Sequence, residues 1–205
     1  MRPVKRGRFI ALEGVEACGK TTQCELLATS LGALHTREPG GTPVGERVRE
    51  LILDVSAPAV TARAETLLLL AARAHHVQSL IEPALATGRD VVCDRFSGST
   101  LAYQGFGRGL PLDELRRLCS WASAGLEPDL VLLLRVSPSV AAARLSDRGL
   151  PDRMEGEGGE FFRRVAAGYD ALAAADPSSW RVLDADGTVE EVVGLIDQAV
   201  RAFFD

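Results

Sequence analysis

Short apolar runs alternate with longer stretches of helical periodicity along the chain. The apolar runs lie at 9–12, 34–36, 91–93, 130–136 and 180–183. Apolar runs between turn signals are typical of strands, and strands that alternate with helices are typical of a parallel sheet. The runs at 91–93 and 130–136 are continuously apolar, so both faces should be buried. The pattern therefore predicts an α/β fold with a five-stranded parallel sheet flanked by helices.

Three helical stretches carry recognisable ends. We expect a helix at 22–31, one at 140–146 after a Ser-Pro start signal, and one at 192–204. The last should begin with a capping box formed by Thr188 and Glu191.

The longest helical pattern and one flexible segment complete the organisation. The stretch 61–86 is long and apolar, and Pro83 is expected to kink it or end it. The segment 147–159 mixes glycine, proline and charged residues, which favours a short lid. Without repeats or a low-complexity linker, residues 1–205 should form a single domain.

Composition and charge narrow the choice of partners and compartment. The formal net charge of −5 argues against a nucleic acid or an anionic membrane as the main partner, because both bind broad basic surfaces. The four cysteines show no CxxC spacing and form no metal-ligand pattern with the three histidines. The basic N-terminal residues lead into a strand rather than a secretory signal, and no run is long enough to span a membrane without charge. We therefore expect a cytoplasmic protein.

The most informative motif follows the first predicted strand. It reads Gly14-Val15-Glu16-Ala17-Cys18-Gly19-Lys20-Thr21, with Thr22 next. Between a strand and a helix this spacing predicts a phosphate-binding loop, in which backbone amides and the helix N-terminus bind phosphate oxygens. Lys20 would reach the β- and γ-phosphates, and the Thr21 hydroxyl would bind Mg²⁺. A mere turn is the alternative, and a chance match in this context would be rare.

Charged residues also follow the next two strands. Arg37 closes the second, and Asp94 and Arg95 follow the third. Because ligands bind at the carboxyl ends of strands in open α/β sheets, these side chains should meet at one edge. Asp94 can hold Mg²⁺ through water, and a guanidinium matches phosphate oxygens with paired donors. A surface salt bridge is the alternative for Asp94 and Arg95 taken alone. The residues thus indicate a P-loop kinase that acts on a small phosphate or hydroxyl acceptor.

Together these motifs resemble those of the thymidylate kinase family. The resemblance rests on the phosphate loop, on Thr-Arg-Glu-Pro-Gly-Gly-Thr at 36–42, on Arg73, and on Asp-Arg-Phe-Ser-Gly-Ser-Thr-Leu-Ala-Tyr-Gln-Gly at 94–105. It extends over nearly the whole chain, in the family's order and approximate spacing. It implies a nucleoside-monophosphate-kinase-like homodimer that transfers a phosphoryl group from Mg-ATP to dTMP, giving dTDP for dTTP biosynthesis.

The resemblance also implies roles for single residues around the acceptor. Arg37 and Arg95 would hold the dTMP phosphate, Glu16 would lie near the sugar 3′-hydroxyl, and Arg73 would donate to a thymine carbonyl. The other residues implied at the base and deoxyribose are Pro39, Leu69, Ser99, Thr100, Tyr103 and Gln104. Tyr103 could exclude a 2′-hydroxyl sterically, whereas turn or cap chemistry is the alternative for the serine and threonine.

The catalytic arginine is implied to come from the lid. Arg148 and Arg153 lie in a pattern similar to the family branch that supplies this arginine from its lid. The other branch carries it in the phosphate loop, where this chain has Ala17 and Cys18. Solvated arginines are the alternative.

The remaining implied features concern adenine and two departures from the family pattern. Arg144, Asp184 and Ala185 would contact adenine. Leu69 stands where the family commonly has phenylalanine, so the base would lose a stacking partner. Cys18 replaces a usual alanine, either as a small inert filler or as a thiol activated by the helix N-terminus.

Two alternatives stay open. A different nucleotide or nucleoside kinase on the same fold would be revealed by a panel of acceptors. A non-catalytic switch that binds ATP and recruits a partner would leave Arg37, Arg73 and Gln104 without a shared purpose.

Overall fold

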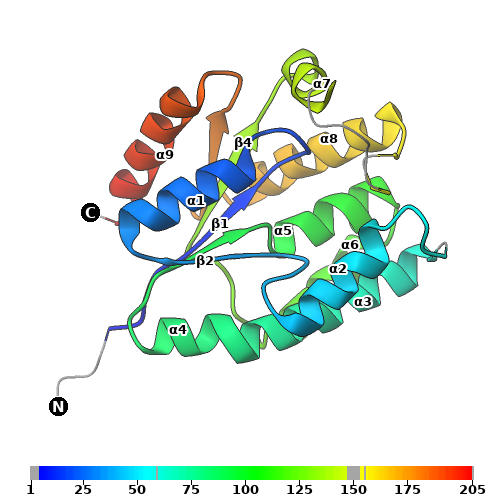
Figure 1. Ribbon diagram of the computed structural model, residues 1–205, viewed down its shortest axis with the longest axis horizontal. Helices are drawn as coiled ribbons and strands as arrows, with labels where there is room; N and C mark the ends of the chain where they lie inside the picture. The colour runs from blue at the N-terminus through cyan, green and yellow to red at the C-terminus, as the bar shows by residue number, and fades with distance from the viewer. Residues whose placement is uncertain (1–4, 59, 147–152, 155, 205) are drawn as a thin grey trace.

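A computed structural model describes residues 5–58, 60–146, 153–154 and 156–204. Its strands form one parallel sheet in the order β2-β3-β1-β4-β5 (Figure 1). The strands are β1 (Phe9–Glu13), β2 (Leu34–Arg37), β3 (Val91–Asp94), β4 (Leu130–Arg135) and β5 (Trp180–Asp184). The five-stranded parallel sheet predicted from the sequence is confirmed, and each strand differs from its expected range by one residue at the carboxyl end.

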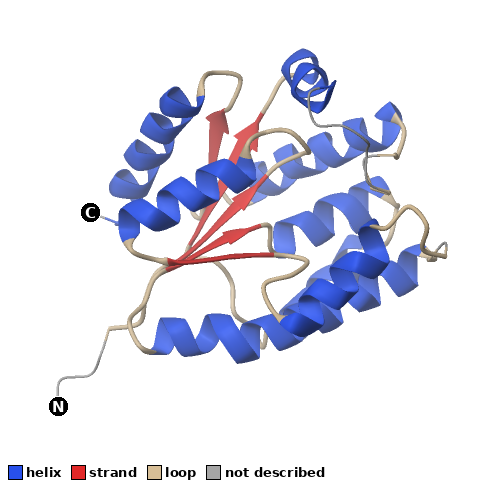
Figure 2. Ribbon diagram, viewed as in Figure 1, coloured by secondary structure: helices blue, strands red, loops and turns tan. Residues whose placement is uncertain are grey.

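Helices fill the connections between the strands (Figure 2). In chain order they are α1 (Lys20–Leu31), α2 (Pro43–Leu53), α3 (Ala62–His76), the π-helix η1 (Val77–Ile81), α4 (Glu82–Ala86), α5 (Ser97–Thr100), the π-helix η2 (Leu101–Gly107), α6 (Leu112–Ala122), α7 (Pro138–Ser146), α8 (Gly159–Ala175) and α9 (Val189–Phe204). The sequence patterns above predict α1, α7, α9 and the run from α3 to α4, but not α2, α6 or α8. A start signal for α2 was available, because the Thr42 hydroxyl accepts a hydrogen bond from the Gly45 N–H just before a proline at the first helical position.

Two apolar cores cover the two faces of the sheet. Ile10 and Leu12 of β1 lie in a core with α1 and α9. Phe9 and Ala11, which alternate with them, lie in a core with η1 and α4. Because successive side chains of a strand point to opposite faces, this alternation shows that β1 is buried on both sides. The burial that the continuously apolar runs predict is therefore confirmed.

The capping box predicted before α9 is present. The Thr188 N–H donates to Glu191 Oε2 at 2.8 Å, and the Glu191 N–H donates to Thr188 Oγ1 at 3.3 Å. At the end of α1, Gly32 adopts a left-handed conformation and its N–H bonds the last turn, so the predicted stop is also confirmed.

The long helix expected at 61–86 is continuous but not uniformly α-helical. Its middle, Val77–Ile81, is a π-helix that leads into Pro83. Proline has no N–H to donate and its ring crowds the carbonyl of Ser79, so the preceding turn widens. Pro83 therefore reshapes the helix without ending it.

The expected lid at 147–159 lies mostly outside the described residues, which exclude 147–152 and 155. Where the segment is described, the Arg153 N–H donates to the Leu53 carbonyl at 3.1 Å, which places it beside the end of α2. The carboxyl boundary of the expected lid was wrong by one residue, because Gly159 already begins α8.

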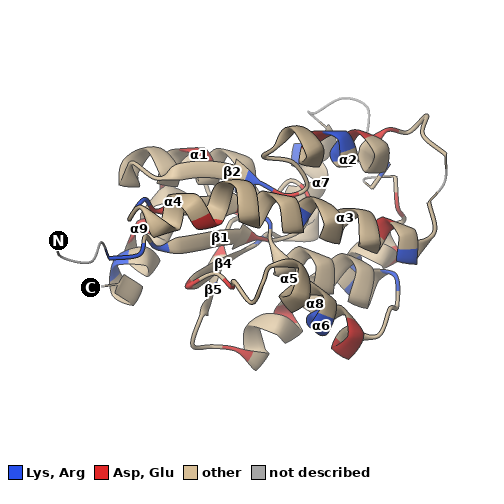
Figure 3. Cartoon of the chain, turned by 90° about the horizontal axis from the view of Figure 1, so that it is seen from below, with Lys and Arg blue, Asp and Glu red and all other residues tan. Residues whose placement is uncertain are grey.

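Charged positions of both signs are interspersed over the elements seen from below in Figure 3. None of the described helices is both long and apolar enough to cross a membrane.

Candidate active site

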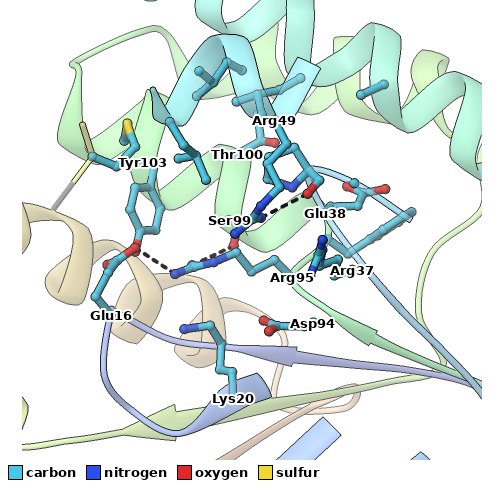
Figure 4. A pocket seen from close by; sticks show the side chains of 18 of the residues that line it. Glu16, Lys20, Arg37, Glu38, Arg49, Asp94, Arg95, Ser99, Thr100 and Tyr103 are labelled. Atoms are coloured by element: carbon cyan, nitrogen blue, oxygen red, sulfur yellow. Dashed lines mark hydrogen bonds and ion pairs between the residues drawn. The ribbon is translucent and has the colours of Figure 1, made fainter. Parts of the chain in front are cut away.

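The carboxyl ends of the strands open into a pocket of about 310 Å³ (Figure 4). The residues predicted from the sequence that line it are Glu16, Ala17, Gly19, Lys20, Thr21, Arg37, Pro39, Leu69, Arg73, Asp94, Arg95, Ser99, Thr100, Tyr103 and Gln104. The phosphate loop, the ends of β2 and β3, and the helices α3, α5 and η2 therefore converge on one cavity.

The phosphate loop has the backbone that its glycines suggest. Gly14, Ala17 and Gly19 all have positive φ angles, of 149°, 59° and 91°. A Cβ on Gly14 would come within 2.6 Å of the Leu134 carbonyl oxygen, so no side chain fits there. Gly19 precedes α1 without a side-chain cap, and the first turn of α1 contains no acidic residue. The helix N-terminus is thus suited to an anionic ligand.

The Lys20 ammonium lies over this loop. Its Nζ donates to the Val15 carbonyl at 2.8 Å and lies 3.4 Å from Cys18 Sγ. Among the described residues no carboxylate forms an ion pair with Lys20, although the side chain is buried. Its positive charge is therefore available to a phosphate.

Thr21 and Asp94 meet at the mouth of the same loop. The Thr21 hydroxyl donates to Asp94 Oδ2 at 2.7 Å. The other carboxylate oxygen, Asp94 Oδ1, is buried without a hydrogen-bond partner in the described part of the chain. An orphaned carboxylate oxygen beside a hydroxyl fits Mg²⁺, which takes few protein ligands and completes its shell with water and phosphate oxygens. No group of three or more His, Cys, Asp or Glu residues among those described forms a dedicated metal cage.

Besides Arg73, three guanidinium groups line the pocket beyond the loop. Arg37 and Arg95 were predicted there, and Arg49 of α2 joins them. Burial, and then the nearby charge of Arg37, lowers the pKa of Arg49. Such crowding of cations favours an anion among them. Sequence reasoning missed Arg49 because it did not predict α2, which carries this side chain to the pocket.

Arg95 is held from several sides. Its Nη2 donates to Glu16 Oε1 at 2.9 Å, and its Nη1 donates to the Gly14 carbonyl at 3.0 Å, to Ser99 Oγ at 3.2 Å and to the Tyr169 hydroxyl at 3.2 Å. Figure 4 shows Arg95 between Glu16 and Ser99, with Lys20 and Asp94 on the side of the phosphate loop. The hydroxyl of Tyr103 also donates to Glu16. Arg95 is therefore preorganised for a ligand.

A buried carboxylate anchors this network from behind. Glu13, 1% exposed, accepts hydrogen bonds from the Ser99 hydroxyl at 2.6 Å and from the Tyr169 hydroxyl at 3.0 Å. Burial raises the pKa of the Glu13 carboxyl. Tyr169 and Glu13 are supporting residues that the sequence analysis did not single out, and only the packing of α8 against η2 brings Tyr169 to the site.

The far end of the pocket carries polar groups on α3 and η2. Arg73 Nε donates to Glu38 Oε2 at 2.7 Å, and Arg73 Nη2 donates to Thr100 Oγ1 at 3.1 Å. Gln104 Nε2 donates to Glu65 Oε1 at 2.9 Å. Fixed polar groups in an otherwise apolar pocket end can read the edge of a flat ligand.

Comparison with known proteins agrees with this geometry. The thymidylate kinase family model matches residues 12–196. The thymidylate kinase of Synechococcus sp. (strain JA-3-3Ab) is 49% identical over 198 residues, which cover 94% of this chain and 95% of that one. That of Chromobacterium violaceum is 45% identical over 194 residues, which cover 92% and 91%. The crystal structure of thymidylate kinase from Ehrlichia chaffeensis superposes with a TM-score of 0.78 at 30% identity, covering 96% of this chain and 99% of that one.

The chain belongs to the thymidylate kinase family. It is therefore a transferase that phosphorylates dTMP to dTDP with ATP as the donor, in the biosynthesis of dTTP. Membership decides between the alternatives above in favour of this kinase over a different nucleotide kinase or a non-catalytic switch.

Some residues expected from the thymidylate kinase resemblance lie outside the pocket. Arg144 of α7 donates to the Ala17 carbonyl at 3.3 Å and to the Gly187 carbonyl at 3.0 Å, so it joins the back of the phosphate loop to the turn that follows Asp184 and Ala185. Gly14, Val15, Cys18 and Thr22 also do not line the pocket.

The two arginines predicted to lie in a lid differ in what the structure describes of them. Arg148 lies outside the described residues. Arg153 Nη1 donates to the Pro58 carbonyl at 3.2 Å, and the side chain does not line the pocket of this thymidylate kinase. Met154, the next residue, does line it and was not predicted.

Proposed function

We propose that this protein holds dTMP and Mg-ATP in the pocket described above and transfers the γ-phosphoryl group between them with its own arginines and Lys20. One observation carries the proposal. A single cavity has the phosphate loop at one end, the Arg37, Arg49 and Arg95 guanidinium groups in between, and fixed polar groups on α3 and η2 at the other. This order matches that of a donor phosphate, an acceptor phosphate and a base.

Catalysis would rest on position and charge. The dTMP phosphate is already ionised at neutral pH, so no strong general base is required. Lys20 and Arg95 would hold the donor and acceptor phosphates in line and would offset the negative charge of the transferred group. The network of Glu16, Ser99 and Tyr169 around Arg95 supports this role, because a donor fixed in advance needs no reorganisation during the reaction.

Mg²⁺ would enter with ATP. Thr21 and Asp94 would hold it, Asp94 through a water molecule, and the metal would supply positive charge against the negative charge of the phosphates. The unpartnered Asp94 Oδ1 supports this assignment.

Recognition of the acceptor would fall to the other end of the pocket. Arg73 would donate to a thymine carbonyl, with Gln104 beside it. Glu16 and Tyr103 would lie against the deoxyribose, where the Tyr103 ring leaves little room for a 2′-hydroxyl. The adenine of ATP would lie on the other side of the phosphate loop, against Arg144.

A homodimer would use the outer face of α3 and α6. These two helices pack together. Leu67 on α3 is 60% exposed and Trp121 on α6 is 82% exposed. Large apolar side chains exposed on adjacent helices favour an interface. The four free cysteines fit the reducing cytoplasm in which we place the protein.

A panel of acceptors tests the proposed recognition. With Mg-ATP and a coupled assay of ADP release, dTMP should be phosphorylated with a clearly higher kcat/KM than dCMP, dGMP or the ribonucleotide TMP. Thymidine should not be phosphorylated, because it lacks the phosphate that the three arginines would hold. Equal turnover of all pyrimidine monophosphates would contradict the roles of Arg73 and Gln104.

Replacing Leu69 by phenylalanine should tighten dTMP binding. Leu69 is a half-buried wall of the pocket, and an aromatic ring there could pack against the base. The expected gain is up to about 1 kcal/mol, the scale of an aromatic pair beyond its buried area. Isothermal titration measures it, with Leu195→Phe on the exposed face of α9 as the control. Unchanged or weaker binding would show that the pocket is adapted to leucine.

A further inference from the structure

A buried chain of polar residues lies behind the base end of the pocket. It begins at Thr36 of β2, whose Oγ1 lies 2.7 Å from His76 Nε2 on α3. His76 Nδ1 lies 3.0 Å from Glu38 Oε1. The other oxygen of the same carboxylate, Glu38 Oε2, accepts from Arg73 Nε at 2.7 Å. All four side chains are buried, and His76 is 0% exposed.

His76 is enclosed and does not line the pocket. A Cβ on Gly41 would come within 2.4 Å of Thr36 Oγ1 and 2.7 Å of His76 Nε2, so the turn at Gly41 closes directly over the pair. No room remains there for a ligand. Any effect of His76 on the reaction must therefore pass through its hydrogen-bond partners.

The chain leaves Arg73 little freedom. Its Nε edge is bound to Glu38, its Nη2 to Thr100, and its Nη1 to Cys119 Sγ at 3.4 Å. Its guanidinium also lies 4.9 Å from the centre of the Phe96 ring. Glu38 could rotate about its own side chain if only one of its oxygens were bound. Because His76 binds the first oxygen, the second stays on Arg73 and the plane of the guanidinium is fixed.

We propose that His76 is a positioning residue for base recognition. Through Glu38 it orients Arg73 so that the second hydrogens of Nη1 and Nη2, which those bonds do not use, point at a carbonyl of the base. This inference rests on the base contact proposed above for Arg73. His76, which does not line the pocket, would thereby contribute to selectivity for the acceptor.

If His76 served only to fill space in the core, it would not need its hydrogen bonds to Thr36 and Glu38. An apolar side chain could fill the same volume, but it would leave a buried hydroxyl on Thr36 and a buried carboxylate oxygen on Glu38 without partners, and unpaired buried polar groups are destabilising. Two isosteric substitutions separate packing from positioning. The amide of asparagine occupies the place of Nδ1 and can reach Glu38, whereas that of glutamine occupies the place of Nε2 and reaches Thr36.

The experiment compares His76→Asn with His76→Gln. The readout is the ratio of kcat/KM for dTMP to that for dCMP, which presents an amino group where thymine has a carbonyl. His76→Asn should keep the wild-type ratio within about threefold, and His76→Gln should lower it at least tenfold, mainly through a higher KM for dTMP. His75→Gln, the exposed neighbour on α3, is the matched control, and thermal unfolding of each variant reports its stability.

The outcomes separate the inference from the proposal on which it rests. Equal losses in His76→Asn and His76→Gln, or no change of the ratio in either, would overturn the positioning role. Arg73→Lys keeps the charge but loses the fork of donors, and it should lower the ratio as well. If it does not, the base contact of Arg73 fails, and the inference fails with it. If His76→Gln does not fold, Glu38→Gln replaces it, because an amide accepts through one oxygen only and should lower the ratio in the same way.

Discussion

Replacing Lys20 by methionine is expected to lower kcat by about a hundredfold to a thousandfold, the loss typical of one preorganised donor at a developing charge. The side chain keeps its length, and the bonds that it loses, to the Val15 carbonyl and Cys18 Sγ, lie within the phosphate loop itself. Binding of dTMP should change little, because Lys20 would contact the donor phosphates. Steady-state kinetics together with equilibrium titration of dTMP separate these two effects.

Lys5 offers a control for the same substitution. It is exposed and lies four residues before the start of β1, whereas the pocket opens at the carboxyl ends of the strands. Lys5→Met should leave kcat and dTMP binding unchanged. If Lys20→Met kept kcat within about threefold of wild type, less than 1 kcal/mol of the barrier, the assignment of Lys20 to the transferred phosphoryl group would be refuted.

The second large effect is expected in the lid. Apart from Lys20 the phosphate loop carries no basic residue, so charge on the transferred group must be offset from elsewhere. Arg148→Ala or Arg153→Ala should lower kcat by about a hundredfold or more, as for other arginines that enter a site on closure, while dTMP binding changes much less. Arg153 is bonded to the Pro58 carbonyl in this structure, so its role requires its side chain to leave that contact.

Arg163, exposed on α8 just beyond this segment, is the control for losing an arginine there. Arg163→Ala should retain wild-type kcat. If both lid variants also stayed within about a factor of three, the lid arginines would not be catalytic and the branch assignment would be wrong.

The parts of the fold that the sequence predicted are those governed by local chemistry. Buried parallel strands are continuously apolar, and a phosphate loop needs glycine at positions where φ is positive. Both features can therefore be recognised from a short stretch of sequence. The rule that ligands bind at the carboxyl ends of strands then brings Arg37, Asp94 and Arg95 to one edge, as the structure confirms.

The parts that sequence reasoning missed depend on tertiary packing. Arg49 reaches the pocket only because α2 packs against α3, and Tyr169 only because α8 packs against η2. The π-helix η2, which carries Tyr103 and Gln104 to the pocket, has no sequence signature comparable to a cap or a capping box. The pairing of Glu38 with His76 and Arg73 likewise requires β2 and α3 to be placed side by side.

The three guanidinium groups of Arg37, Arg49 and Arg95 also limit which chemical groups a competitive inhibitor can place in the pocket. A competitive compound that places an uncharged group among them would displace water from cations without replacing its hydrogen bonds, and would lose affinity for doing so. A compound that supplies an anion there gains affinity but carries a charge that hinders passage across a lipid bilayer. The end proposed for the base, lined by Leu69 and Arg73, is therefore the part of this pocket from which a membrane-permeable compound should draw most of its affinity.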